Sequence, residues 1–326
     1  MNPLVSVILP NYNHRRYLPK RIESIFDQTF RDFELIILDD CSTDQSQEFI
    51  KEYAQRDARV KTYFNKKNSG STFRQWNKGV ELAKGKFIWI AESDDWADIT
   101  FLEKLIKSIN KGENIGIAYS QSYEINESDE VIASRIEWTN DLSNHKKWVE
   151  DYWNLGVNEI NENLCLKNTI PNVSAALIRR DAYISVGEAD NSMKYAGDWE
   201  LYIKILMQFN IAFVSEPLNY NRRHDQSQRV KNTYTKLAVK EILMILDKIE
   251  PILKESNKRE AYKLLSKRWA SSLYHDASTY TIKEMWAFSK ALRLSLGKER
   301  NNLFPLMIRR ILFFDKLLNY LKPSSV

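Results

Sequence analysis

Over residues 4–123, short apolar runs alternate with segments in which apolar residues recur at helical spacing. Short apolar runs are typical of buried strands, and the helical spacing is typical of amphipathic helices. The pattern predicts strands at Leu4–Leu9, Phe33–Leu38, Val60–Phe64, Lys86–Ala91 and Ile115–Tyr123, and helices at Tyr17–Gln28, Gln45–Gln55, Ser71–Ala83 and Ile99–Asn110. Pro10 is expected to end the first strand. The order of elements indicates a series of βαβ units.

Polar residues stand where three of these strands end. Continuous apolar strands separated by helices imply a mostly parallel sheet that is covered on both faces. In such sheets, ligands bind beyond the carboxyl ends of the strands. Asn11–Asn13, Asp39–Asp40 and Glu92–Asp95 all fall at those ends. Their coincidence indicates a ligand site more strongly than any one segment alone.

The pattern is less regular after residue 123. Residues 124–136 are expected to form a polar turn or hairpin, and the Trp- and Asn-rich residues 137–170 a loop and helix over the site. Ala175–Ile178 is expected to be a strand and Asp198–Phe209 a helix. From about Thr233 the pattern is helical to the end. The chain is therefore expected to divide into an α/β domain, residues 1–230, and a helical C-terminal region, residues 231–326.

Composition narrows the class of protein. The 326-residue chain has a net charge of +5 and 43% hydrophobic residues, which is ordinary for a globular protein. The mild basic bias fits an anionic substrate or membrane surface and, without a basic stripe, does not indicate nucleic acid. Cys41 and Cys165 lack metal-type spacing and are expected to be free thiols. No apolar stretch approaches the ~18 residues that span a bilayer, and no signal peptide is evident, so we expect a cytoplasmic protein.

Two neighbouring carboxylates, Asp94 and Asp95, follow the strand predicted at Lys86–Ala91. Such carboxylates repel each other unless a cation lies between them. Mn²⁺ or Mg²⁺ is often held by one or two carboxylates together with substrate phosphates. The alternative is a helix N-terminus, where the helix dipole favours negative charge. The flanking strand favours the metal site.

Five further side chains are candidates, each with a plain structural alternative. Tyr12 can stack on a base or lie in a surface loop, and Asp39 can bind a nucleobase or ribose or stabilise a turn. Arg74 can neutralise phosphate or belong to a solvated helix face. Asp198 stands at the start of a predicted helix, where it can be a base that faces a cleft or the N-cap of the helix. His224, beside two arginines, can contact a metal or phosphate or be structural.

Taken in order, these segments resemble the motifs of family 2 glycosyltransferases. The segments that carry the resemblance are Val5–Asn13 (VSVILPNYN), Ser24–Phe30 (SIFDQTF), Glu34–Asp44 (ELIILDDCSTD), Ser93–Asp95 (SDD), Ala196–Glu200 (AGDWE) and Tyr220–Ser227 (YNRRHDQS). Several motifs in the right order, spanning residues 4–228, are more specific than any single one. The resemblance implies an α/β fold of the GT-A nucleotide-diphospho-sugar transferase type, with a mostly parallel central sheet, and an inverting transferase.

The resemblance also implies how the donor is bound. Asp39 would contact the base of the donor nucleotide, and Tyr12 would stack near it. Pro10 and Arg74 would frame the nucleotide. Asp94 would approach the ribose or the sugar.

The reaction implied by the resemblance needs a metal and a base. Asp95 would bind Mn²⁺ or Mg²⁺ on the diphosphate, and His224 would complete the metal or phosphate contacts. Asp198 would be the catalytic base. The sugar would pass from a nucleotide-diphosphate donor to a hydroxyl of a glycan or lipid-linked acceptor, in cell-surface polysaccharide or glycan biosynthesis.

The sequence departs from the family pattern at several positions. Glu92 stands where aspartate is common, and Gly197 replaces a frequent glutamate. Asn68–Gly79 is one residue longer than the usual segment, which puts the role of Arg74 in doubt. A Gln-x-x-Arg-Trp motif is absent, which favours transfer of one or a few sugars. The departures leave an alternative function, a non-catalytic sugar-nucleotide-binding or assembly module that keeps the fold.

The C-terminal residues 303–326 combine apolar side chains with basic ones. A helix there would be amphipathic and cationic, and so suited to the inner face of a membrane. The alternative is a helix that packs on the catalytic domain or on the second subunit of a homodimer.

Overall fold

The computed structural model describes residues 2–223 and 235–276, together with residues 281, 284 and 294. The chain divides into two compact units, Met1–Ser227 and Gln228–Val326. The first unit contains the sheet, and the described part of the second consists of helices.

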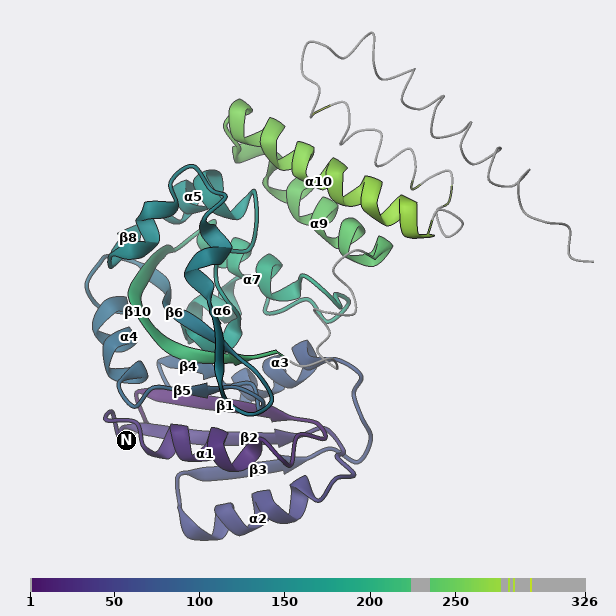
Figure 1. The fold of residues 1–326 in the computed structure, drawn as a ribbon. Coiled ribbons are helices and arrows are strands. Elements are labelled where there is room, and N and C mark those ends of the chain that lie inside the picture. Colours follow the sequence, from purple (N-terminus) through teal and green to yellow (C-terminus); the bar gives the residue numbers. More distant parts are fainter. Residues whose placement is uncertain (1, 224–234, 277–280, 282–283, 285–293, 295–326) are drawn as a thin grey trace, which may run out of the picture. The chain divides into compact units, whose positions relative to one another are not determined.

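The N-terminal half of the first unit is a parallel four-stranded sheet with the order β3-β2-β1-β4 (Figure 1). Its elements are β1 (Val5–Asn11), α1 (Leu18–Phe26), β2 (Phe33–Asp39), α2 (Ser46–Arg56), β3 (Val60–Phe64), α3 (Thr72–Leu82) and β4 (Phe87–Ile90). All seven residues of β1 and all seven of β2 are buried, which explains why both strands are continuous apolar runs. The predicted βαβ order is confirmed.

The prediction that Pro10 ends the first strand is wrong. β1 continues through Pro10 to Asn11. The Ile8 carbonyl accepts a hydrogen bond on the β4 side, and the Asn11 carbonyl accepts one from Asp40 on the β2 side. Because successive residues alternate in direction, the Pro10 nitrogen faces the β4 side, where strand pairing has already ended at Ile8. The strand tolerates proline because no ladder donor is lost.

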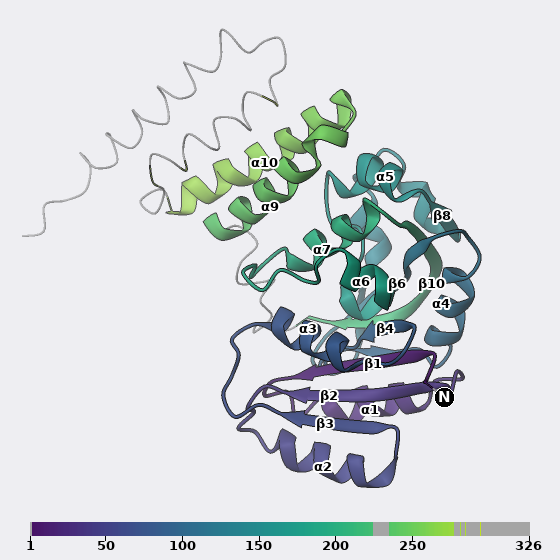
Figure 2. The ribbon, with the colours of Figure 1, turned by 180° about the vertical axis from the view of Figure 1, so that it is seen from behind.

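Helices cover both faces of this sheet, as two opposite views show (Figures 1 and 2). On one face, α1, α2 and α4 (Phe101–Ile109) pack into a core with Val5, Val7 and Leu9. On the other face, α3 approaches so closely that a Cβ on Gly79 would lie 3.1 Å from Cδ1 of Leu38. The helices cover the faces of the sheet, and the polar segments lie at the carboxyl ends of its strands.

The sheet continues in the order β4-β9-β6-β10-β5, with β7 beside β6 and β8 beside β10. β9 is antiparallel to both neighbours, whereas β6 and β10 are parallel. The elements are β5 (Trp96–Ala97), β6 (Ile115–Ile125), β7 (Val131–Ser134), β8 (Tyr152–Asn154), α5 (Gly156–Glu159), β9 (Ala176–Arg179), α6 (Arg180–Ser185), α7 (Gly197–Leu206) and β10 (Asn210–Arg222). Single turns of helix at Arg135–Thr139, His145–Val149, Ile160–Leu164 and Val173–Ala175 connect them. The predicted α/β class with a mostly parallel central sheet is confirmed.

The second unit contains α9 (Lys236–Ile249), a short turn at Glu250–Ile252 and α10 (Glu255–Asp276). The Tyr262 hydroxyl of α10 donates to Asp247 of α9 at 3.1 Å, and both helices bury apolar residues. Among the helices that the structure describes, none has the length and apolar character needed to cross a membrane. The segment 303–326, predicted to be amphipathic, lies outside the described residues.

Candidate active site

The predicted polar segments meet at the carboxyl edge of the parallel strands. Asn11 pairs in register with Asp39 across β1 and β2. Ile8 pairs with Ile90, so β4 ends beside β1. Because the strands are parallel neighbours, Glu92–Asp95 follows β4 at the same edge.

Asp39 lies at this edge with 1% of its surface exposed. Its carboxylate accepts hydrogen bonds from Asn11 Nδ2 at 2.8 Å, Ser42 N at 2.9 Å and Gln47 Nε2 at 2.8 Å. These bonds hold the end of β2 against β1 and α2. Its predicted contact with a nucleobase stays a prediction.

The neighbouring Asp40 organises the loop that leads into α3. Its carboxylate accepts from Asn65 Nδ2 at 2.6 Å, from Gln75 Nε2 at 3.0 Å and from the Ser69 hydroxyl at 2.7 Å. Arg74, on the first turn of α3, is exposed and donates from Nη1 to the Ser69 carbonyl at 3.3 Å. The structure therefore holds this arginine at the rim of the same edge.

Tyr12 remains 47% exposed just beyond the buried Pro10. The loop around it is fixed, because Asn13 N donates to the Ser42 hydroxyl at 2.9 Å and Asn13 Oδ1 accepts from Thr43 N at 2.8 Å. A large aromatic ring that folding leaves uncovered is suited to stacking on a base.

Glu92 begins the acidic segment Glu92–Asp95 and reaches toward α3. Its carboxylate accepts from Trp76 Nε1 at 2.7 Å, and its backbone N–H donates to the Ser174 hydroxyl at 3.1 Å. Burial raises the pKa of Glu92 to about 8, and repulsion from Asp94 adds to the shift. The surroundings of Glu92 therefore favour its neutral, protonated form over the carboxylate anion.

Asp95 is surrounded by protein donors and is 3% exposed. It accepts from Asn172 Nδ2 at 2.6 Å, Asn221 Nδ2 at 3.2 Å and Arg222 N at 2.9 Å. A carboxylate has about four lone-pair sites, so these three donors occupy most of them.

The donor set of the acidic segment fits a divalent cation. Burial, together with repulsion from Asp94, raises the pKa of Asp95 to about 6. Carboxylates that repel each other in this way are stabilised by a cation between them. Asp94 and Glu92 are partly exposed, whereas Asp95 is buried. In the described part of the chain, no three His, Cys, Asp or Glu side chains converge as a complete protein cage for a metal.

Asp198 lies at the start of α7 and is partly buried. Its Oδ2 accepts from Asn168 Nδ2 at 3.1 Å, and its Oδ1 accepts from Trp199 N at 2.7 Å. The Trp199 indole donates to the Leu164 carbonyl at 2.9 Å. The segment from Leu164 to Asn168 therefore orients this carboxylate.

The first turn of α3 connects Asp198 with the acidic segment. A Cβ on Gly197 would lie 2.6 Å from Cε2 of Phe73. The Phe73 ring packs edge-on against Trp76 at 4.8 Å between centroids, and Trp76 donates to Glu92. The departure from the family pattern at Gly197 has a steric reason, since the Phe73 ring occupies the space of a side chain there.

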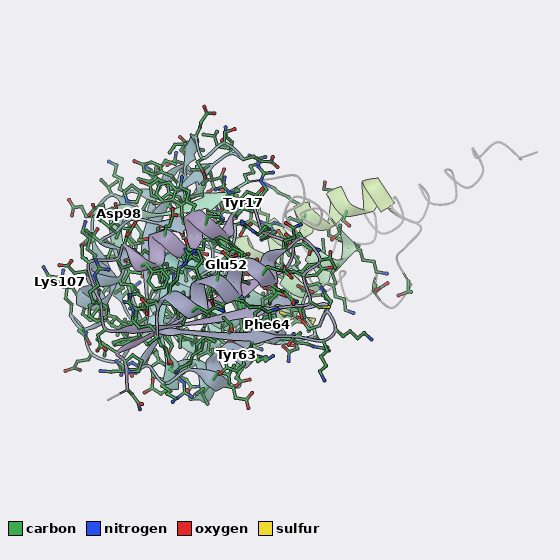
Figure 3. All side chains as sticks on the ribbon, turned by 90° about the horizontal axis from the view of Figure 1, so that it is seen from below. Tyr17, Glu52, Tyr63, Phe64, Asp98 and Lys107 are labelled. Atoms are coloured by element: carbon green, nitrogen blue, oxygen red, sulfur yellow. The ribbon has the colours of Figure 1, made fainter. Side chains whose placement is uncertain are left out.

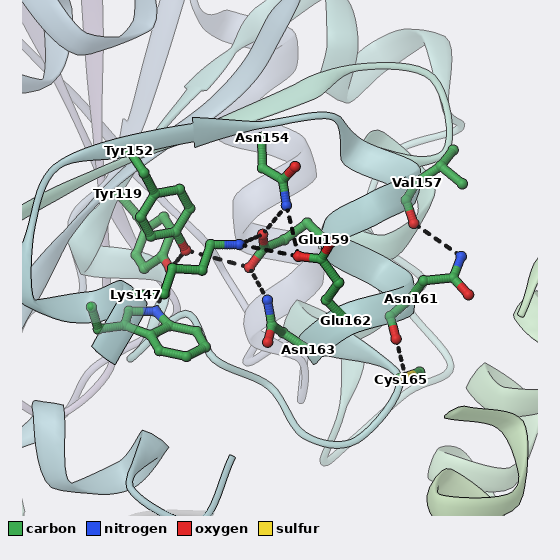
Figure 4. Close-up of polar contacts among 11 residues, drawn as sticks. Tyr119, Lys147, Tyr152, Asn154, Val157, Glu159, Asn161, Glu162, Asn163 and Cys165 are labelled. Atoms are coloured by element: carbon green, nitrogen blue, oxygen red, sulfur yellow. Dashed lines mark hydrogen bonds and ion pairs between the residues drawn. The ribbon is translucent and has the colours of Figure 1, made fainter. Parts of the chain in front are cut away.

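A buried polar network supports the segment that precedes Asn168 (Figure 4). Glu159 is fully buried, accepts from Asn154 Nδ2 at 2.8 Å and Asn163 Nδ2 at 2.9 Å, and pairs with Lys147. Satisfied networks of this kind make a segment rigid. The helical turn at Ile160–Leu164 leads directly from this network to the residues that contact α7.

Arg222 holds the acidic segment from the β10 side. Its Nε donates to the Asp94 carbonyl at 2.8 Å, and its guanidinium pairs with Asp129 in the β6–β7 hairpin. The guanidinium carbon lies 4.7 Å from the ring centroid of Tyr17, which Figure 3 labels. The arginine therefore fixes the backbone that carries the acidic side chains.

Three residues of this site were not predicted from the sequence. Asn168 belongs to residues 137–170, which were expected to form a loop and helix over the site, and Asn172 lies between that stretch and the strand expected at Ala175–Ile178. Arg222 lies in a motif that drew attention to His224. His224 lies outside the described residues. The remaining predicted residues, Pro10, Tyr12, Asp39, Arg74, Asp94, Asp95 and Asp198, lie at the strand edge or on the elements that contact it.

Curated glycosyltransferases match part of the chain. An uncharacterized glycosyltransferase of Methanocaldococcus jannaschii, MJ1057, is 39% identical over 132 residues, which make up 40% of this chain and 45% of that protein. The putative teichuronic acid biosynthesis glycosyltransferase TuaG of Bacillus subtilis is 38% identical over 105 residues, 32% of this chain and 41% of that protein. The chain thus spans less than half the length of these relatives.

Solved structures share the fold at low sequence identity. TarS 1–349 of S. aureus, in complex with UDP-GlcNAc, has a TM-score of 0.64 at 18% identity and covers 90% of this chain and 80% of its own. The mannosyltransferase PcManGT of Pyrobaculum calidifontis, in complex with GDP-Man and Mn²⁺, has a TM-score of 0.58 at 13% identity, covering 99% and 89%. These likenesses confirm the predicted GT-A-type fold.

The family model "Glycosyl transferase family 2" matches residues 6–187. That match takes in β1 from Ser6 onward, the acidic segment and the Asn168–Asn172 stretch. Because it covers more than half of the 326 residues, the chain belongs to glycosyl transferase family 2.

Proposed function

We propose that the protein transfers a sugar from a nucleotide-diphosphate donor to an acceptor hydroxyl, with inversion at the anomeric carbon. The observation that carries this proposal is the series of contacts from Glu92 through Trp76 and Phe73 to Gly197, which joins the acidic segment to Asp198. Such a transferase needs negative charge stabilised at the leaving diphosphate and a base at the attacking hydroxyl. The contacts support the presence of both in one site.

The donor nucleotide is assigned to the β1–β2 edge. Tyr12 offers an exposed ring for the base, with Pro10 and Asp39 beside it. Arg74 at the rim is exposed to solvent, so its guanidinium can neutralise phosphate charge. The complexes of TarS with UDP-GlcNAc and of PcManGT with GDP-Man support a nucleotide sugar as the donor.

Mn²⁺ or Mg²⁺ bound at the acidic segment would stabilise the negative charge that develops on the leaving diphosphate. We assign its protein ligand to Asp94, because the carboxylate of Asp95 already accepts three hydrogen bonds. Asp95, the ligand predicted from the sequence, then keeps the segment in place. The Mn²⁺ in the PcManGT complex supports the choice of metal.

Asp198 is the proposed base. It accepts the proton of the acceptor hydroxyl as that oxygen attacks the anomeric carbon, so one displacement inverts the configuration. The hydrogen bonds from Asn168 Nδ2 and Trp199 N hold the carboxylate in one orientation before the acceptor arrives. General-base assistance of this kind contributes roughly 10²–10⁴-fold to a rate.

The acceptor belongs, in this proposal, to cell-surface polysaccharide or glycan synthesis. The name of the relative TuaG, a putative teichuronic acid biosynthesis glycosyltransferase, supports this assignment. A lipid-linked acceptor, membrane contact through residues 303–326, a cytoplasmic location and a homodimer stay predictions from the sequence.

The second candidate is a non-catalytic module that binds sugar nucleotides. Gly197 in place of a frequent glutamate favoured it, but the Phe73 ring accounts for that glycine sterically. Hydrolysis of the donor in the presence of Mn²⁺ separates the two functions, because only an enzyme turns the donor over.

The proposal is tested with Asp198→Asn in two measurements. A thermal-shift panel of UDP- and GDP-sugars with Mn²⁺ identifies the donor, since a ligand of the folded state raises the Tm. We expect Asp198→Asn to keep that shift and to lose about 10²–10⁴-fold in sugar transfer.

The matched control for this test is Asp181→Asn. Asp181 lies in the first turn of α6 and accepts from the next backbone N–H at 2.8 Å, as Asp198 does in α7, but its side chain is 74% exposed. It should transfer sugar at the wild-type rate. Wild-type turnover in Asp198→Asn would refute the assigned base.

A further inference from the structure

Arg21 of α1 is a buried cation that the proposed reaction does not use. The side chain has 0% exposure, and its guanidinium carbon lies 4.7 Å from the ring centroid of Trp89 in β4. Its Nε, Nη1 and Nη2 atoms have no hydrogen-bond partner within the described part of the chain. Burying a charged group without hydrogen bonds is unfavourable, so a compensating interaction must be present.

The compensating charge lies at the end of β4. Trp89 precedes Glu92 by only three positions in the strand that carries the acidic segment. Burial lowers the pKa of Arg21 to about 10, and Asp95, Asp94 and Glu92 all act in the opposite direction. Arg21 therefore remains charged at neutral pH, where Asp95 and Asp94 supply the negative charge that stabilises it, whereas Glu92, with its pKa raised to about 8, is mostly protonated.

We propose that Arg21 is the internal counter-charge of the acidic segment. Its guanidinium offsets the repulsion between Asp94 and Asp95 when no metal is bound, and it weakens the affinity of the segment for a divalent cation. The first half of this inference concerns the protein alone. The second half rests on the proposed function, in which the acidic segment binds that cation.

The counter-charge has two opposite effects. Without metal it offsets the mutual repulsion of the carboxylates and stabilises the fold. With metal it repels the incoming cation, because two like charges in a protein interior are screened less than in water. Removing Arg21 should therefore destabilise the metal-free protein and tighten cation binding.

The test compares Arg21→Met with Arg135→Met in the full-length protein. Arg135 is a matched control, since it is 7% exposed and its guanidinium carbon lies 4.9 Å from the Trp138 ring, but it pairs with Glu124. Mn²⁺ affinity is measured from the electron paramagnetic resonance signal of free Mn²⁺, and Tm is measured in EDTA.

We expect Arg21→Met to bind Mn²⁺ about tenfold more tightly than the wild type. Its Tm in EDTA should fall by about 5 °C, and saturating Mn²⁺ should recover most of that loss. Arg135→Met should lose stability that Mn²⁺ does not recover and should bind Mn²⁺ with wild-type affinity. An unchanged Mn²⁺ affinity in Arg21→Met would overturn the second half of the inference.

A double variant tests the first half without any metal. Asp94→Asn should raise the Tm in EDTA more in the Arg21→Met protein than in the wild type, since the missing counter-charge leaves more repulsion to relieve. Equal effects in the two backgrounds would overturn the inference. If Arg21→Met does not fold, a double variant that folds supports the inference, and one that fails while Arg135→Met folds overturns it.

The proposed function and this inference fail in different ways. A wild-type protein that binds no Mn²⁺ refutes the cation in the proposed function, and with it the second half of the inference. The double-variant comparison in EDTA still decides whether Arg21 and Asp94 are coupled.

Discussion

At the scale of single residues, Asp94 and Asp95 differ in how the fold surrounds them. Asp95 is buried and accepts from donors on two distant segments, one with Asn172 and one with Asn221 and Arg222. Asp94 is partly exposed, and its own carbonyl is held by Arg222. In the proposed function the two neighbours therefore have different tasks, with Asp95 structural and Asp94 binding the cation.

Exchanging each aspartate for asparagine separates these tasks. Asp95→Asn places an NH₂ group against donors and leaves buried groups unpaired, so we expect a loss of about 1–3 kcal/mol in the free energy of unfolding. Asp94→Asn should lose no stability in EDTA, because it relieves the repulsion from Asp95, and should lose the Mn²⁺-dependent part of donor affinity. Chemical denaturation and donor titrations with and without Mn²⁺ measure the two effects. The reverse result, metal dependence lost only in Asp95→Asn, would restore Asp95 as the ligand.

The sequence could not distinguish these two aspartates. Adjacent residues share the same strand end and the same side-chain chemistry, so their pattern is equivalent. What separates them is a set of donors from residues 172, 221 and 222, which only the folded chain brings to Asp95. These contacts join residues that are far apart in the sequence, so the local sequence pattern does not predict them.

At the scale of elements, α3 and α7 meet at one crowded contact. The Phe73 ring lies where a side chain on Gly197 would extend. Alanine has a higher helix propensity than glycine, so Gly197→Ala would by itself stabilise α7. A loss of stability in this variant would therefore come from the crowding against Phe73.

We expect Gly197→Ala to lose about 1–3 kcal/mol of stability and to transfer sugar more slowly, because Asp198 is the next residue. Gly197→Ala combined with Phe73→Leu should recover part of both losses by making room. Denaturation curves and initial rates on the single and double variants measure this. Full activity and stability in Gly197→Ala alone would contradict the tight contact.

The elements of the first half could be predicted because each strand and helix has its own periodicity. β1 and β2 are buried on both faces, and the helices between them show one apolar side. β10 was not predicted, because its pairing with β6 shifts register around Pro217 and its sequence mixes polar with apolar residues. β8 has only three residues and depends on β10 for its pairing. Strands of this kind form through pairing with neighbouring strands, and their own sequence pattern does not predict them.

At the scale of the whole molecule, the proposed site belongs to one unit. Its described residues lie between Pro10 and Arg222, and the first compact unit is Met1–Ser227. The family match ends at residue 187, before Asp198 and β10. Donor binding should therefore need more than the matched segment and less than the full chain.

Two truncations test this expectation. A protein of residues 1–227 should unfold in one cooperative transition and show the same donor-dependent rise in Tm as the full chain, since the contacts of the donor edge are internal to that unit. A protein of residues 1–187 lacks α7 and β10, which pairs with β6 and supplies Arg222 and Asn221 to the acidic segment. It should fail to fold cooperatively. A 1–227 protein that folds but no longer responds to donor would mean that residues 228–326 supply part of the donor site.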